Sequence, residues 1–255
     1  MATINKYEYQ RTDVSLMDQG YFNSEVDFEQ LNRLLIPFKR VGIIVPIVED
    51  KRMAVDHMGA IQTRLPNTDF KHARVIGGGS AASSIAISDA SRLVDSGICE
   101  AVLVTSWYNN NKDQAGWFWC ILTRNKRGFA KIAMVVDEFE LADDPRYGTY
   151  DGYRKLLQPM RYMNISHVVG HMNGGTNDKC ESEAYDHYFE DKDFKLVSKK
   201  NTDGEVGHLD SAIELLETID ECLGMSAGSA GIMSINYGYG GFYNAIYVKL
   251  TSVLR

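Results

Sequence analysis

The stretch Gly77-Gly78-Gly79-Ser80-Ala81-Ala82-Ser83-Ser84 decides the fold, because a strand pattern ends before it and a helical pattern begins within it. Residues 73–76 are typical of a strand end, and residues 81–96 have helical apolar spacing that stops at Gly97. Ser80 is therefore predicted at a strand-to-helix turn, where glycines allow close backbone approach and the helix presents free N–H groups. Two interpretations remain open: Ser80 is a nucleophile beside an oxyanion site, or it only caps the helix.

The chain around this turn alternates between strand and helix patterns. Strands are predicted near residues 41–45, 101–105, 131–139, 165–169, 195–198, 232–237 and 244–250, and helices at 28–35, 51–62, 81–96, 151–163 and 209–223. Interleaved strands and helices indicate an α/β fold with a mixed sheet. We expect a single domain over residues 1–255. Residues 1–26 are polar and mixed in character, and are interpreted as a surface arm.

Composition excludes several classes of function. The 255 residues are 44% hydrophobic with a net charge of −7, which argues against nucleic acid as a partner. No apolar run is long enough to span a membrane, and residues 1–10 lack the apolar core of a signal peptide. The four cysteines lie far apart without CxxC pairing, which indicates reduced thiols, a cytoplasmic location and no metal site.

Four loop sites carry the candidate chemistry. They are the Ser80 turn, the loop that opens with His171 after the 165–169 strand, His208 before the 209–223 helix, and a glycine-rich turn over 238–241. Histidines at the ends of two elements, together with a serine on a glycine-rich turn, are typical of nucleophilic catalysis. The alternative is a purely structural role, in which the imidazoles of His171 and His208 only form hydrogen bonds with backbone carbonyls.

In order and in several spacings, these sites resemble the motifs of the ketosynthases, which are thiolase-fold enzymes that condense acyl groups on carrier proteins. Ser80 falls where the family has its nucleophilic cysteine, with Arg92 and Gly97 at the family's spacing from it. The other matching segments are 126–129 and 134–142, His171 with the residues after it, Gly207-His208-Leu209, and residues 236–241 with Asn244. The likeness covers roughly residues 70–250 and implies a layered α/β/α thiolase-like fold with mixed sheets, in abridged form.

The resemblance also implies roles. Ser80, His171 and His208 would be catalytic, and Gly238, Tyr239, Gly240 and Gly241 would form an oxyanion and substrate turn. Thr176, Asp178, Glu181 and Asn244 would support them. The implied activity is acyl transfer from an acyl carrier protein thioester without a cofactor, in a homodimer paired through residues 73–76 or in a heterodimer with a ketosynthase.

The chain departs from the family at the nucleophile, where a serine replaces the cysteine. Unlike a thiol, a hydroxyl needs a base to be nucleophilic at neutral pH. This substitution and the short chain favour an alternative function, a non-catalytic subunit similar to a chain-length factor. A third interpretation, a phosphate cradle at Gly77–Gly79, is disfavoured because the Gly-Lys-Ser/Thr ending of a P-loop is missing.

Overall fold

The polypeptide folds around a mixed sheet whose ten described strands run in the order β3-β2-β4-β5-β1-β6-β10-β9-β7-β8. The structure, a computed structural model, describes residues 1–12, 26–47, 51–109, 115–124, 130–141, 143, 148–170, 176–190, 193–197, 209–224, 230–238 and 240–250. The strands are β1 Thr3–Thr12, β2 Val41–Pro46, β3 Phe70–Ile76, β4 Ala101–Asn109, β5 Ala115–Thr123, β6 Ala130–Phe139, β7 His167–Val169, β8 Lys195–Val197, β9 Gly231–Gly238 and β10 Phe242–Leu250. The helices are α2 Phe28–Leu35, α3 Lys51–Arg64, α4 Ala82–Asp95, α5 Tyr150–Leu157, α6 Thr176–Phe189 and α7 Asp210–Gly224, with short 3-10 turns η1 Gly79–Ala81 and η2 Gln158–Met160.

The sheet contains the same topology twice. In the first half β2 pairs in parallel with β3 and β4, β4 pairs antiparallel with β5, and β5 with β1. In the second half β7 pairs in parallel with β8 and β9, β9 antiparallel with β10, and β10 with β6. The halves join where β1 pairs with β6, at Thr3↔Lys131 and Ile4↔Ala130. Helices α2, α3 and α4 of the first half therefore correspond to α5, α6 and α7 of the second.

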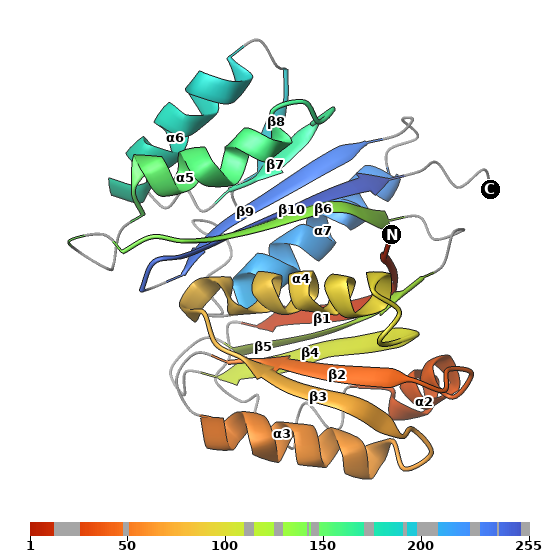
Figure 1. Ribbon diagram of the computed structural model, residues 1–255. Coiled ribbons are helices and arrows are strands. Elements are labelled where there is room, and N and C mark those ends of the chain that lie inside the picture. Colours follow the sequence, from red (N-terminus) through yellow and green to blue (C-terminus); the bar gives the residue numbers. More distant parts are fainter. Residues whose placement is uncertain are drawn as a thin grey trace.

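The helices form layers over the two half-sheets (Figure 1). Helices α5 and α6 cover the outer side of the second half, α2 and α3 cover the outer side of the first, and α4 and α7 lie between them. Each layer contact has its own apolar core: one at α2 and α3, one at α5 and α6, and the largest around α4 and α7. The predicted layered α/β fold with a mixed sheet is confirmed.

Helix α4 owes its central place to small side chains. Ten of its residues are buried, mostly alanines and serines with a few larger aliphatic residues. A helix enclosed on nearly all sides needs such small residues to approach its neighbours closely. The helix stops at Gly97, which has a left-handed φ of 77° and donates from its N–H to the Val94 carbonyl at 3.1 Å.

The first turns of α4 and α7 bind each other through two serines. The hydroxyls of Ser83 and Ser211 lie 2.7 Å apart, fully enclosed. Ser83 Oγ also accepts from the N–H of Ala212 at 3.2 Å, and Ser211 Oγ accepts from the N–H of Ser84 at 3.1 Å. The second residue of each helix thus satisfies an N–H in the first turn of the other, and the two contacts are reciprocal like the two halves of the sheet.

The predicted strands at 101–105, 131–139, 165–169, 232–237 and 244–250 all lie in or overlap β4, β6, β7, β9 and β10, and the helices at 81–96 and 209–223 are α4 and α7. The helical spacing at 28–35 and 51–62 is borne out by α2 and α3. Helix α6 is an addition to the prediction, which places residues 171–178 in a loop and assigns no element to residues 179–189. Among the described helices, none combines the length and apolarity needed to cross a bilayer.

The expectation of a surface arm is wrong for residues 3–12. These residues form β1, an interior strand of the sheet that pairs with β5 along its whole length. Its polar side chains have partners that the sequence does not show. Tyr7 and Tyr9 donate to the two carboxylate oxygens of Asp220 on α7, at 2.5 and 2.8 Å, and Glu8 accepts from the indole N–H of Trp119 at 3.2 Å. Residues 13–25 of the expected arm lie outside the described residues.

Replacing Ser83 with alanine should lower the free energy of unfolding by about 1–3 kcal/mol, because the Ala212 N–H loses its acceptor inside the core. Ser211→Ala should cost a similar amount through the N–H of Ser84. The double variant should lose less than the sum, because the shared hydroxyl pair is lost only once. Urea unfolding of the four proteins measures these values.

Ser96→Ala is the matched control. This exposed serine lies just past the other end of α4 and donates to the Leu93 carbonyl at 3.2 Å. Its loss should change stability by less than about 0.5 kcal/mol. A Ser83 variant as stable as the Ser96 variant would contradict the role of the reciprocal serine contact.

Candidate functional site

Ser80 lies at the strand-to-helix turn that the sequence predicted. Strand β3 ends at Ile76, η1 holds Ser80, and α4 begins at Ala82. The turn depends on Gly78 and Gly79, whose φ values of 152° and 57° are unfavourable for residues with a Cβ. It closes with a hydrogen bond of 3.1 Å from the N–H of Ala81 to the Gly78 carbonyl, and Ser80 itself is half-buried.

The glycine turn at 238–241 packs directly on the Ser80 turn. A Cβ added to Gly238 would lie 1.8 Å from the carbonyl oxygen of Gly78 and 3.3 Å from the Cβ of Ala81. Only glycine permits this approach. The structure therefore brings together two of the sites that the sequence singled out, although 158 residues separate Ser80 from Gly238.

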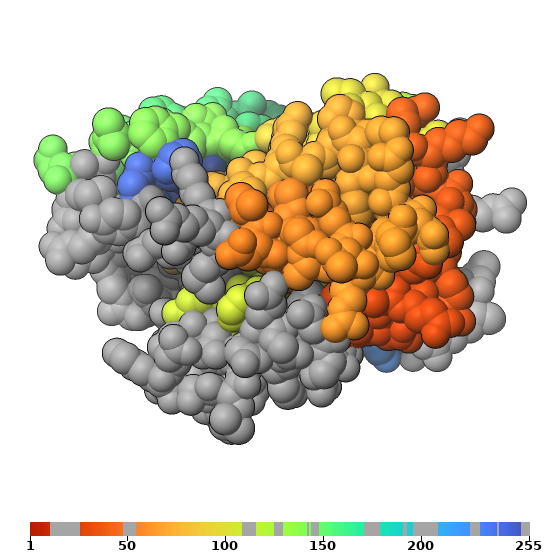
Figure 2. Space-filling model, turned by 90° about the horizontal axis from the view of Figure 1, so that it is seen from below, coloured from red at the N-terminus to blue at the C-terminus, as the bar shows by residue number. Residues whose placement is uncertain are grey.

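The β9–β10 hairpin that contains this glycine turn is also held by the backbone of Glu140, just after β6. Gly240 and Gly241 have left-handed φ values of 93° and 88°. The Gly241 carbonyl accepts from the N–H of Glu140 at 3.0 Å, and a Cβ on Gly241 would lie 2.3 Å from the Glu140 carbonyl oxygen. In the space-filling view the blue hairpin accordingly lies beside the green segment that contains the end of β6 and α5 (Figure 2).

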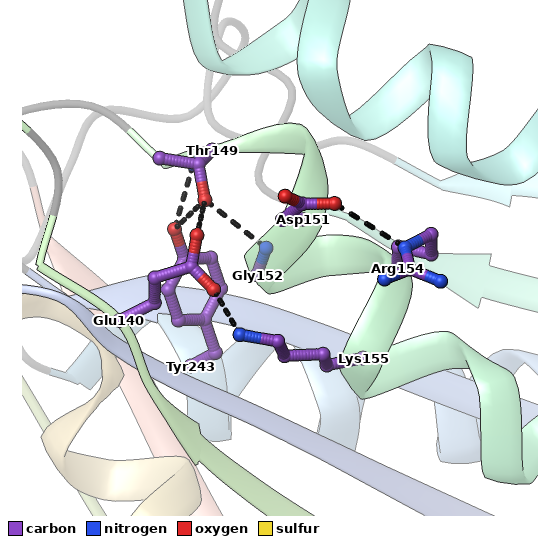
Figure 3. Close-up of polar contacts among 7 residues, drawn as sticks. All are labelled: Glu140, Thr149, Asp151, Gly152, Arg154, Lys155 and Tyr243. Atoms are coloured by element: carbon purple, nitrogen blue, oxygen red, sulfur yellow. Dashed lines mark hydrogen bonds and ion pairs between the residues drawn. The ribbon is translucent and has the colours of Figure 1, made fainter.

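Glu140 binds the glycine turn through its backbone, and its side chain belongs to a polar network at the start of α5 (Figure 3). Its carboxylate accepts from the Thr149 hydroxyl at 2.8 Å and from the Lys155 ammonium at 2.5 Å. Thr149 caps α5 by accepting from the N–H of Gly152 at 3.0 Å, and its own N–H donates to the Tyr243 hydroxyl at 2.6 Å. The network thus joins β6, α5 and β10 just beyond the glycine turn.

The network also shifts the acidities of its members. The hydrogen bond from Lys155, followed by the one from Thr149, lowers the pKa of the Glu140 carboxyl. Burial raises the pKa of the Tyr243 phenol, and the contacts with Thr149 partly oppose that rise. Glu140 is therefore ionised and Tyr243 is neutral at pH 7.

The supporting residues have separate places. Asn244 on β10 is buried and donates to the Ser88 hydroxyl at 2.8 Å and to Asp137 at 2.5 Å, so it holds the middle of α4 against the sheet. Glu181 on α6 is buried and accepts from the Tyr185 hydroxyl. Thr176 and Asp178 belong to the first turn of α6, which corrects their expected place in a loop.

Three predicted site residues, His171, His208 and Tyr239, lie outside the described residues. The described neighbours are Gly170, where an added Cβ would lie 2.4 Å from Glu181 Oε1, and Leu209, which is fully buried at the start of α7. Within the described part of the chain, no three His, Cys, Asp or Glu side chains cluster so as to hold a metal.

Solved structures resemble the chain over most of its length, whereas no family model and no curated protein match it. The ketosynthase from module 6 of the bacillaene synthase of Bacillus subtilis 168 superposes with a TM-score of 0.70 at 15% identity, over 88% of this chain and 54% of that one. The oxazolomycin ketosynthase domain OzmH KS8 of Streptomyces albus JA3453 gives 0.75 at 11% identity, over 97% and 94%. The 3-oxoacyl-(acyl carrier protein) synthase III, FabH, of Pseudomonas aeruginosa PAO1 gives 0.65 at 10%, over 100% and 99%.

The chain has a ketosynthase-like, thiolase-type fold. It spans about half the length of the bacillaene ketosynthase that it matches. At these identities the comparison establishes the fold of the ketosynthase-like chain and not its chemistry.

Sequence reasoning missed the residues that fix the glycine turn from behind, which are Glu140, Thr149 and Tyr243. Thr149 carried a local signal, since a threonine followed two residues later by an aspartate is typical of a helix start. The contacts from Glu140 and Tyr243 to Thr149 depend on tertiary structure and have no local signature.

Gly238→Ala should lower the free energy of unfolding by about 1–3 kcal/mol, because the new methyl group overlaps the Gly78 carbonyl and forces the two turns apart. Gly59→Ala is the control, since Gly59 is exposed in α3 and has nothing within 4 Å of an added Cβ. That change should raise stability by about 0.5–1 kcal/mol. Urea unfolding measures both, and equal stability of the two variants would refute the close contact.

Glu140→Gln should flatten the acid limb of the stability profile. The folded-state pKa of Glu140 is lowered, so its contribution is complete above the ordinary glutamate value of about 4.3 and is lost as pH falls through the folded value. At pH 7 the substitution should cost about 0.2–1 kcal/mol, a modest value because Lys155 is 48% exposed. Urea unfolding between pH 7 and 3 tests this.

Glu138→Gln, two residues earlier on β6, serves as the comparison for that series. It should leave the acid limb as steep as in the parent protein. If Glu140→Gln also leaves the slope unchanged, the Glu140–Lys155–Thr149 contacts do not stabilise the fold.

Proposed function

We propose that the chain transfers acyl groups through Ser80, taking them from a thioester on an acyl carrier protein. The observation that supports this most is the contact between the Ser80 turn and the glycine turn at Gly238, on a ketosynthase-like fold. A nucleophile and an oxyanion turn must lie side by side for acyl transfer. The proposal also agrees with the chemistry of one structural neighbour, FabH, which is a 3-oxoacyl-(acyl carrier protein) synthase.

The oxyanion site in this proposal consists of the N–H of Ser80 and a backbone N–H from Tyr239 or Gly240. Ser80 stands at the N-terminal end of α4, where the helix dipole favours negative charge. The N–H of Ser84 already donates to Ser211 Oγ, so it is not available to an oxyanion. In the proposal, the N–H groups that bind the oxyanion therefore belong to residues before Ser84.

His171 or His208 is proposed as the base. The Ser83–Ser211 contact joins the first turn of α7 to that of α4, and His208 precedes Ser211 by three residues just as Ser80 precedes Ser83. In the reaction Ser80 Oγ bonds to the thioester carbon and gives its proton to an imidazole. The carbon–sulfur bond then breaks, and the carrier thiol leaves with that proton.

A non-catalytic role, as a subunit similar to a chain-length factor, is the second candidate. The serine in place of a cysteine favours it, because a hydroxyl is the weaker nucleophile. For either role we propose a dimer through β3. Among the described strands β3 lies at the edge of the sheet, and an open edge needs a cover.

Intact-mass spectrometry with an acyl carrier thioester tests the proposal. The parent protein should gain the mass of one acyl group, and Ser80→Ala should gain none. Ser80→Cys should be acylated faster, because a thiol is partly ionised at neutral pH. His171→Ala and His208→Ala together should slow acylation of the serine protein by at least about 100-fold.

Ser96→Ala, whose hydroxyl lies outside the turn, is the control and should be acylated like the parent. An unmodified parent protein together with an unmodified Ser80→Cys variant would refute acyl transfer and leave the scaffold role. Equal acylation of the parent and Ser80→Ala would show that another residue is modified.

A further inference from the structure

A cavity lies at the end of α4 opposite the Ser80 turn. Its volume is about 650 Å³, within the range of small-molecule sites. The turn from α2 to β2, the turn from α4 to β4, and the ends of β1 and β5 meet there. The lining residues are Asn5, Pro37, Phe38, Lys39, Arg40, Val94, Gly97, Cys99, Glu100, Thr123 and Arg124. Since α4 has 14 residues, the cavity lies about 20 Å from Ser80.

The charged residues around this cavity are three cations and one anion, and the anion is already neutralised. Glu100 accepts from the backbone N–H groups of Lys39 and Arg40 at 2.7 and 3.2 Å, and the Arg40 guanidinium lies 3.3 Å from its other oxygen. These contacts lower the pKa of Glu100 and fix its charge.

Two of the cations keep their charge available. Arg124 donates to the Asp95 carbonyl at 3.3 Å, and it has no carboxylate partner in the described part of the chain. The Lys39 ammonium forms no ion pair among the described residues, although its charge acts on Glu100 from a longer distance and helps to lower the pKa of that carboxyl. Both side chains are exposed. An anion in the cavity would therefore meet two positive charges that form no ion pair among the described residues.

The remaining wall is largely apolar. Pro37, Phe38 and Val94 supply carbon surface beside the cations. On the same wall Thr123 is 3% exposed, and its hydroxyl has no hydrogen-bond partner among the described residues. Strand β1 is irregular here, because its pairing with β5 shifts between Ile4 and Lys6 at the lining residue Asn5. The site thus combines cations, carbon surface and a buried hydroxyl that a ligand could satisfy.

We propose that this cavity binds a small organic phosphate, with the phosphate between Lys39 and Arg124 and its apolar group against Phe38. These two cations match the charge of a phosphate monoester dianion better than that of a monocarboxylate. The apolar wall supplies the contact that inorganic phosphate cannot make. The site is separate from the Ser80 turn and does not depend on the function proposed for it.

Isothermal titration calorimetry with phenyl phosphate at low ionic strength tests the site. Phenyl phosphate should bind at least about tenfold more tightly than inorganic phosphate or phenol. Lys39→Gln and Arg124→Gln should each weaken it by about tenfold or more. Phe38→Ala should weaken phenyl phosphate and leave the weak binding of inorganic phosphate unchanged. Amide shifts of Arg40 and Glu100 on titration report the place of binding without any variant.

Arg33→Gln is the matched control, because Arg33 is an exposed cation on α2 that pairs with Glu29 and does not line the cavity. It should keep the parent affinity. The proposal is overturned if phenyl phosphate fails to bind, if inorganic phosphate binds as tightly, or if Arg33→Gln weakens binding as much as Lys39→Gln and Arg124→Gln do. Amide shifts confined to residues away from the cavity would overturn it as well.

Discussion

Two serine hydroxyls that meet between α4 and α7 are the constraint on which the molecule depends. Each helix begins with N–H groups that have no partner inside the helix, and both beginnings are buried between the two half-sheets. Burying unpaired amides is costly, and large side chains would hold the helices apart. Ser83 and Ser211 are small enough for contact, and each satisfies an amide of the other helix. Because α4 and α7 lie so close together, α4 also needs alanines at its other buried positions, where the apolar core packs against it.

The geometry of the candidate site depends on the Ser83–Ser211 contact. Once the first turns of α4 and α7 are joined, the turn that precedes α4 is fixed beside this contact, and that turn contains Ser80. The glycine hairpin then closes over the Ser80 turn through Gly238, while Glu140 and Thr149 fix the same hairpin from behind. Rigid elements thus hold the turn on both sides, which is what a preorganised oxyanion site requires.

The sequence predicted those elements whose burial is visible in their own residues. Strand β2 is predicted by its continuous apolar run, and helix α7 by apolar residues that recur with the helical period. Strand β1 is not, since Tyr7, Glu8 and Tyr9 are polar and find their partners on α7 and β5. At the site, Ser80 and Gly238 were identified from glycine-rich turns. The Ser83–Ser211 pair and the Glu140 network stayed hidden, because each joins segments about ten or more residues apart that make no local pattern.

The duplicated topology bears on how the chain acquires its fold during synthesis. In each half the first strand pairs with the last, β1 with β5 and β6 with β10, so each half closes only when its final strand has been made. Closing such long loops makes folding slow. Until the second half is complete, the face of α4 that packs on α7 stays open to solvent. A first half whose strands have paired before the second half is made would therefore present an uncovered helix face, and this is the stage most exposed to aggregation.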